Sequence, residues 1–303
     1  MLSGRPPYGA GVRRRLVLLV LLLGLAVAAG GWIRPSVHAG ATGQAGSCGT
    51  RKGAHPRVYR HVVWILFEND SYKDVIGSSS APYLNGLARR CGLATNYSAI
   101  THPSLPNYIA LTSGSTHGIS DDGGPDEHTL SGPSIFSQLG AGWRAVAESM
   151  PSPCAHDDAG EYLARHNPAV YYASVAAACR TQDAAGPLRV SARFTFVTPN
   201  RCNDGHDCPL ASVDRWLSHA LPPLLASPAY RQGGTAIFLT WDEGGHESNQ
   251  VPVIVVSPYT RAGTRSGAAF DHYSLLGTTE SMLGVRCLAA ACHAASMRRA
   301  FGL

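Results

Sequence analysis

Four apolar runs, rich in β-branched and aromatic residues, constrain the fold of this chain more than any other feature. They are HVVWILF (61–67), RFTFV (193–197), TAIFLTW (235–241) and VPVIVVS (251–257). Strands that are apolar almost throughout are typical of a sheet covered on both faces. Helix-like segments lie between the runs, at 81–90, 134–142, 212–228 and 273–283. This alternation predicts an α/β fold with a mostly parallel central sheet.

The N-terminus is set apart from this pattern. Arg13-Arg14-Arg15 precedes an uncharged apolar run at 16–33, and Val37-His38-Ala39 offers a small-residue cleavage site. A basic start, a short apolar middle and such a site predict a secretory signal over residues 1–39. The alternative is a retained membrane anchor facing outward, because the run is just long enough to span a bilayer. Residues 40–303 contain no evident linker or repeat and are expected to form a single domain.

The net charge argues against one class of partner. The formal charge is +5, and five arginines account for all of it, at positions 5, 13, 14, 15 and 34. A domain that starts at residue 40 is therefore formally neutral and has no basic footprint for nucleic acid. We expect contact with a membrane only through the N-terminal segment or a lipid substrate. The sequence leaves the oligomeric state open.

The exported part carries eight cysteines, an even number that suggests disulfides in an oxidising compartment. We predict nearest-neighbour pairs, although the sequence alone does not fix the pairing. The predicted bridges are Cys48–Cys91, Cys154–Cys179, Cys202–Cys208 and Cys287–Cys292. A metal-thiolate site is a weaker alternative, because no CxxC spacing is present.

Polar side chains follow each apolar run. They are Glu68-Asn69 after the first, Asp204 and His206 after the second, Asp242-Glu243 after the third, and Asp271-His272 beyond the fourth. Ligands of α/β folds bind beyond the carboxyl ends of the strands. Each cluster alone has an ordinary explanation as a turn, a glycine loop or a helix cap. Together they predict a site where carboxylates and imidazoles hold a divalent cation.

The stretch THPSLPNY (101–108) places Ser104 between two prolines, on a stiff loop before an apolar run. Such a serine is either plain turn chemistry or a nucleophile presented to a substrate. A serine protease is disfavoured, since GxSxG is absent around Ser104 and the many carboxylates would repel an acyl oxyanion. A metal-assisted serine beside acidic ligands fits phosphate ester chemistry better.

These motifs resemble a known family. FENDSY, HPSLPNY, TPNRCNDGHD, TWDEGG, NQVPVIVVSP and DHYSLLGTTE are similar, in order, to the blocks of the bacterial phosphoesterase family of non-specific phospholipases C and acid phosphatases. That family belongs to the alkaline-phosphatase-like superfamily. The resemblance runs from about His61 to Gly284 and is strongest to short secreted acid phosphatases of the phosphatidylinositol 3-phosphatase type. It implies a three-layer α/β/α sandwich.

The resemblance also implies roles for individual residues. Ser104 would be the nucleophile that forms a phosphoserine, and Glu68, Asn69, Asp242 and Glu243 would hold a metal next to it. Asp204, His206 and His272 would line the opposite side of the phosphate, Asp204 as a ligand of a second metal and the histidines as catalytic groups. Asn107 would hold phosphoryl oxygens, and the ARHNP block adds His166 and Asn167 to the phosphate site.

The expected activity is therefore that of a secreted, metal-dependent phosphomonoesterase with one or two divalent ions of undetermined identity. The substrate would be a phosphate-ester small molecule or a phospholipid headgroup. A phospholipase C acting on phosphodiesters is the first alternative, disfavoured because Asp70 and Tyr72 stand where those enzymes have Arg and Phe. A binding module without catalysis is a minor one, because nucleophile and ligands are all present. Asp242-Glu243, where two-zinc relatives have Asp-His, favours a harder metal or a single-metal site.

Overall fold

The first apolar run forms the central strand of a seven-stranded sheet. In the computed structural model, which describes residues 47–245 and 248–303, strand β1 (His61–Phe67) pairs in parallel with β5 (Phe194–Thr198) and with β6 (Thr235–Trp241). The full order is β4-β5-β1-β6-β7-β2-β8. The remaining strands are β4 (Trp143–Ala147), β7 (Val253–Val256), β2 (Gly92–Ala94) and β8 (Arg265–Ser266), with β3 (Tyr97–Ser98) and β9 (Phe270–Asp271) forming a separate pair. The predicted secretory signal at 1–39 lies outside the described residues.

One strand runs against the others. β7 is antiparallel to both of its neighbours, β6 and β2. Its carboxyl end therefore lies at the opposite edge from the ends of β1, β5 and β6. The expectation that all four apolar runs end at one edge is wrong for this run. Asp271 and His272 reach the site edge by another route, through β9 and the start of the next helix.

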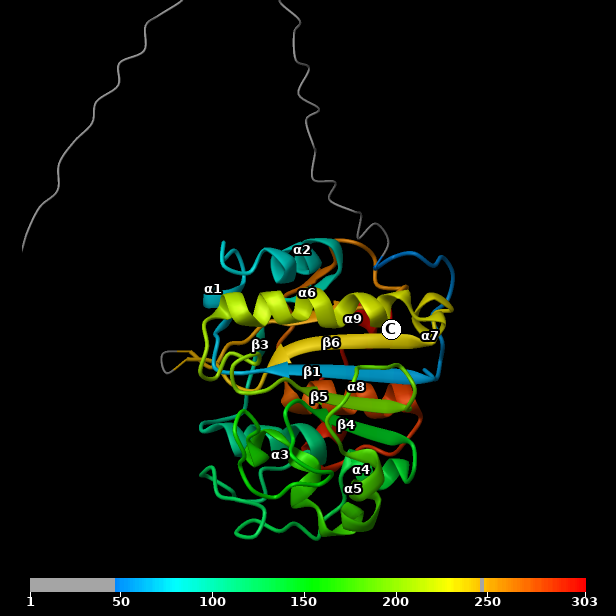
Figure 1. Cartoon of the computed structure of the whole chain (residues 1–303). Coiled ribbons are helices and arrows are strands. Elements are labelled where there is room, and N and C mark those ends of the chain that lie inside the picture. The colour runs from blue at the N-terminus through cyan, green and yellow to red at the C-terminus, as the bar shows by residue number, and fades with distance from the viewer. Residues whose placement is uncertain (1–46, 246–247) are drawn as a thin grey trace, which may run out of the picture. The chain divides into compact units, whose positions relative to one another are not determined.

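Helices cover both faces of the sheet, as Figure 1 shows. On one face α6 (Leu210–Ala226) packs beside α2 (Pro82–Arg90), and Trp216 of α6 meets Phe67 of β1 edge to face. On the other face α8 (His272–Leu283) packs beside α3 (Ser104–Ser113), and the Trp64 indole donates a hydrogen bond to Thr279 of α8. The predicted three-layer α/β/α arrangement is confirmed.

The other helices are short and connect these layers. They are α1 (Tyr72–Val75), α4 (Ile135–Leu139), α5 (Ala176–Gln182), α7 (Pro228–Arg231), α9 (Arg298–Phe301) and the 3-10 turns η1 (Ala164–His166), η2 (Pro168–Tyr171), η3 (Ala173–Val175) and η4 (Ala289–Cys292). None of the helices in the described part of the chain has the length and apolar character needed to cross a bilayer.

All four predicted disulfides form, joining Cys48 to Cys91, Cys154 to Cys179, Cys202 to Cys208 and Cys287 to Cys292. Two of them close short loops, and the Cys202–Cys208 bridge closes the loop after β5 that carries Asp204 and His206. Cross-links of this kind persist in oxidising compartments outside the cytosol.

Candidate active site

Ser104 is the first residue of α3, at the edge of the sheet where the parallel strands end. The preceding loop is held largely by Asn107, and the Asn249 amide also donates to the Thr101 carbonyl oxygen. The Asn107 carboxamide oxygen accepts hydrogen bonds from the backbone N–H groups of Ile100 (3.0 Å) and Thr101 (3.1 Å), and its amide donates to the carbonyl oxygens of Thr101 and Pro103. Ser104 is thus presented rigidly at a helix N-terminus, where the backbone dipole favours an anion.

Glu68, directly after β1, faces the serine. The Ser104 hydroxyl donates to Glu68 Oε2 at 3.2 Å, and the Tyr108 hydroxyl donates to Oε1 at 2.6 Å. Glu68 is fully buried. Burial first, and then repulsion from Asp242 and Asp204, raise the pKa of Glu68 well above its usual value. A carboxylate in this position therefore needs a proton or a cation beside it.

Asp242 and Glu243 follow β6 and complete this wall. The Asp242 N–H donates to the Phe67 carbonyl oxygen at 3.0 Å, which sets Asp242 beside the end of β1. Neither carboxylate oxygen of Asp242 has a partner of normal hydrogen-bond geometry, although the Ser104 hydroxyl and the N–H groups of Glu243 and Asn69 lie close enough to lower its pKa. Burial and the Glu243 charge outweigh them and raise that pKa well above normal.

Asn69 and Glu243 shape the same wall from two sides. Asn69 holds a left-handed φ of 64°, which turns the chain sharply after Glu68 and is an unusual conformation often kept at functional sites. Glu243 accepts from the Asn107 amide at 3.3 Å and pairs with His102 Nδ1 at 3.0 Å. The loop that carries Ser104 and the loop after β6 are therefore tied together.

The loop after β5 brings Asp204 to the other side of Glu68, where the Glu68 N–H donates to the Asp204 carbonyl oxygen at 2.9 Å. His166 lies between the two acids, with Nδ1 at 3.1 Å from Asp204 Oδ2 and Nε2 at 3.2 Å from Glu68 Oε1. Burial lowers the pKa of His166 well below normal. The neutral His166 ring donates from Nδ1 to Asp204. Its Nε2 then carries a lone pair that faces the Glu68 carboxylate and has no hydrogen bond.

These contacts fit a divalent cation. Four buried carboxyl groups crowd one edge, those of Glu68, Asp204, Asp242 and Glu243. Orphaned carboxylate oxygens and a lone pair that faces an acceptor both require positive charge nearby. Ligand atoms of Glu68, His166 and His206 lie within 4.8 Å of one another. Two adjoining sets of possible ligands share Glu68. The set around Ser104 consists of Glu68, Asn69, Asp242 and Glu243. The second set consists of Glu68, Asp204, His166 and His206.

A family model, the Phosphoesterase family, matches residues 78–286. The chain belongs to this family. It is therefore a hydrolase of phosphoric esters. A phosphatidylinositol-3-phosphatase of Mycobacterium tuberculosis is 32% identical over 272 residues, covering 86% of this chain and 88% of that protein. A probable acid phosphatase of Kluyveromyces lactis is 28% identical over 72% of this chain, which spans only 56% of that relative's length.

Solved structures agree on the fold of this phosphoesterase. A member of the alkaline phosphatase superfamily from Vibrio parahaemolyticus superimposes with a TM-score of 0.54 at 10% identity, covering 81% of this chain and 72% of that one. The lipoteichoic acid synthase LtaP from Listeria monocytogenes gives 0.53 at 9% identity, covering 79% of this chain and 77% of that one. At such low identity these likenesses establish the shared fold alone.

Two predicted site residues of the phosphoesterase, His272 and Asn107, make contacts that hold the site together. His272 is buried, its Nε2 donates to the Asp242 carbonyl oxygen at 2.5 Å, and its Nδ1 accepts from the Tyr97 hydroxyl at 2.8 Å. Burial lowers the pKa of this neutral ring to about 4. His272 thus positions Asp242, and Asn107 braces the loop that carries Ser104; their predicted roles at the phosphate stay predictions.

Asn167, by contrast, turns away from Ser104. Its amide donates to Asp183 Oδ2 at 2.7 Å and to the Tyr162 hydroxyl at 3.1 Å, in a buried pocket beside Cys179. The structure therefore brings His166 to the site but not its neighbour Asn167. Alternation of this kind is expected when two adjacent residues leave a 3-10 turn on opposite sides.

Asp183 predicts a pH dependence of stability. Burial raises its pKa from 3.8 to about 7. A folded state with the higher pKa binds more protons, so its stability falls as pH rises from about 4 to about 7, by up to about 4 kcal/mol. We expect the melting temperature of the chelator-treated protein to fall between pH 5 and pH 8, and Asp183→Asn to flatten that fall. Exposed Asp157→Asn is the control; identical slopes for both variants would contradict the assignment.

Sequence reasoning missed Arg165, although it stands in the same ARHNP block. Its Nη2 donates to His206 Nε2 at 3.1 Å, while Asp122 Oδ2 and Asp158 Oδ2 lie at 3.9 and 3.7 Å from the guanidinium. His206 in turn donates from Nδ1 to Asp207 at 2.6 Å. A half-buried guanidinium at the rim of the carboxylate cluster is well suited to bind phosphoryl oxygens. The single clue in the sequence is its place before His166.

Proposed function

We propose that this phosphoesterase is a secreted, metal-dependent phosphomonoesterase that works through a phosphoserine on Ser104. The observation that carries the proposal is the Ser104 hydroxyl set at a helix N-terminus, 3.2 Å from a carboxylate oxygen of Glu68 within a buried acidic cluster. The disulfides support an extracellular location. Its substrate class includes phosphorylated lipid headgroups, as the name of the Mycobacterium tuberculosis relative suggests.

The chemistry follows from the placement of the side chains. The Ser104 oxygen bonds to phosphorus as the bond to the alcohol oxygen breaks, and Glu68 is placed to take the hydroxyl proton. His206, at the rim, would give a proton to the leaving oxygen only after Nε2, which accepts from Arg165 in the structure, has itself taken up a proton. Water then attacks phosphorus, restores the serine and releases inorganic phosphate. A divalent ion held by Glu68, Asn69, Asp242 and Glu243 would supply Lewis-acid stabilisation of the phosphoryl charge.

A product assay separates this proposal from the phospholipase C alternative. We expect an aryl phosphomonoester to yield inorganic phosphate at least tenfold faster than a matched aryl phosphodiester is cleaved. Chelation should abolish the activity and added divalent metal should restore it. Faster cleavage of the diester would favour the phospholipase C alternative. Full activity in chelator that has removed all bound metal would overturn the metal requirement.

Arg165 gives a graded prediction for the same reaction. A charge-assisted hydrogen bond to a phosphoryl oxygen contributes about 1.5–3 kcal/mol, so Arg165→Gln should lower kcat/KM for a monoester about 10- to 100-fold. Inhibition by inorganic phosphate should weaken in parallel, and Arg165→Lys should recover part of both. Exposed Arg89→Gln is the matched control. Unchanged phosphate inhibition in Arg165→Gln would show that the guanidinium only supports the neighbouring loops.

A further inference from the structure

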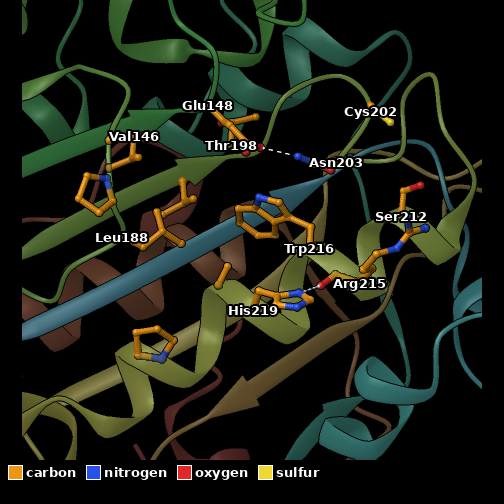
Figure 2. Close-up of a pocket in the computed structure, with 15 residues that line it drawn as sticks. Val146, Glu148, Leu188, Thr198, Cys202, Asn203, Ser212, Arg215, Trp216 and His219 are labelled. Carbon is orange, nitrogen blue, oxygen red and sulfur yellow. Dashed lines mark hydrogen bonds between the residues drawn. The ribbon is translucent and has the colours of Figure 1, made fainter.

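A second cavity, of about 680 Å³, lies outside the acidic cluster, on the α6 face of the sheet (Figure 2). Its floor is made by Val146 of β4 and Val197 of β5, both buried. One wall is α6 and the other is the segment Gly186–Leu188, which follows α5 without forming a helix. The volume lies in the range of small-molecule sites. We call this cavity the α6 groove.

The wall formed by α6 is a helix stripe beside its core face, and within this stripe Trp216 also packs on Phe67 of β1. The core face of α6 carries the buried residues Val213, Leu217 and Leu221. The adjacent stripe recurs at spacings of three and four and lines the groove with Ser212, Arg215, Trp216, His219, Ala220 and Pro223. Residues at these spacings share one face of a helix. Three residues of this stripe, Trp216, Ala220 and Pro223, offer apolar surface to an occupant together with Leu188 opposite.

One end of the groove is polar, and its charge is uneven. Glu148 already accepts two hydrogen bonds on Oε2, from the Asn200 N–H at 3.0 Å and the Asn203 amide at 2.9 Å. Arg215 is exposed, and within residues 47–245 and 248–303 its guanidinium forms no hydrogen bond or ion pair. Glu148 keeps its negative charge but is bound to the loop after β5, whereas the Arg215 guanidinium is left open to an occupant. An apolar trough that ends at a guanidinium complements a molecule with a long apolar chain and an anionic head.

We propose that the α6 groove binds a single-chain anionic lipid. Its chain lies along Trp216, Ala220 and Leu188, and its head group pairs with Arg215. The site is distinct from the acidic cluster around Ser104, whose carboxylates would repel an anionic head without a metal. The proposal is independent of the proposed phosphomonoesterase activity.

Calorimetric titration with dodecanoate, below its micelle concentration, tests the proposal on the purified protein. We expect saturable binding of one molecule per chain that saturating inorganic phosphate does not displace. Dodecyltrimethylammonium, with the same chain and the opposite charge, should bind at least about fivefold more weakly. Equal binding of the two amphiphiles would overturn the role of Arg215, and displacement by phosphate would place the lipid at Ser104 instead.

Two variants locate the bound chain. Arg215→Gln should weaken dodecanoate binding about fivefold, whereas the exposed Arg89→Gln on α2 should leave it unchanged. Ala220→Trp should fill the groove and weaken binding at least tenfold. Turnover of an aryl phosphate at the wild-type rate shows that each variant is folded. Wild-type affinity in a folded Ala220→Trp protein would overturn the proposal, and Arg215→Leu, which keeps the groove apolar, tests the charge alone.

Discussion

Replacing Ser104 by alanine is expected to reduce phosphate release from a monoester by about a thousandfold or more, equivalent to at least about 4 kcal/mol of transition-state stabilisation. The loss should appear in kcat, because the proposed phosphoserine intermediate cannot form without the hydroxyl. Folding should be unaffected, since the hydroxyl makes one hydrogen bond, to Glu68, and its removal relieves no packing. The measurement is steady-state kinetics with circular dichroism on the same samples.

Ser218→Ala, at a half-buried position of α6, is the matched control and should keep wild-type kinetics. Substrate or product affinity gives a second readout for Ser104→Ala. Inhibition by inorganic phosphate should persist, because the helix N-terminus and Arg165 remain in place. A Ser104→Ala protein that turns over at the wild-type rate would contradict the assignment of the nucleophile.

Asp242→Asn is expected to have opposite effects on the metal-free and the metal-loaded protein. Without metal, the orphaned carboxylate destabilises the fold, because burial and the Glu243 charge oppose its ionisation. The neutral amide removes this cost, so the free energy of unfolding at neutral pH should rise by at least about 1 kcal/mol, the value of one pKa unit. With metal, the variant should bind the ion more weakly and lose activity.

Thermal unfolding with chelator and with a series of divalent-ion concentrations measures both effects. The wild-type melting temperature should climb as metal is added, and that of Asp242→Asn should start higher and climb less. Asp214→Asn is unsuitable as a control, since Asp214 accepts from two backbone N–H groups; exposed Asp157→Asn serves instead. A fully metalled, active Asp242→Asn protein would refute the ligand role.

The sheet could be predicted because its central strands are buried on both faces. β1 and β6 have the predicted bounds, and β5 is displaced by one residue. These strands were predictable because a short run that is apolar throughout is typical of a strand buried on both faces. The direction of β7 could not be predicted, because a buried strand has the same apolar sequence pattern whether it is parallel or antiparallel to its neighbours. The pairs Cys202–Cys208 and Cys287–Cys292 followed from proximity along the chain.

The site was predictable in its residue types and less so in its contacts. Carboxylates after β1, β5 and β6 had to meet once those strands were parallel neighbours. Arg165 is far along the sequence from any strand end, so no strand pattern indicated that it belongs to the site. The inward turn of His272 and the outward turn of Asn167 depend on Tyr97 and Asp183, whose positions only the folded chain reveals.

Trapping the intermediate tests the central claim most directly. The metal-loaded protein is mixed with a fast-leaving aryl phosphomonoester, quenched in acid within the first turnovers, digested and examined by mass spectrometry. We predict a gain of one phosphoryl group on the peptide that contains THPSLPNY, located on Ser104 and absent from Ser104→Ala. Rapid turnover with that peptide unmodified would contradict the account.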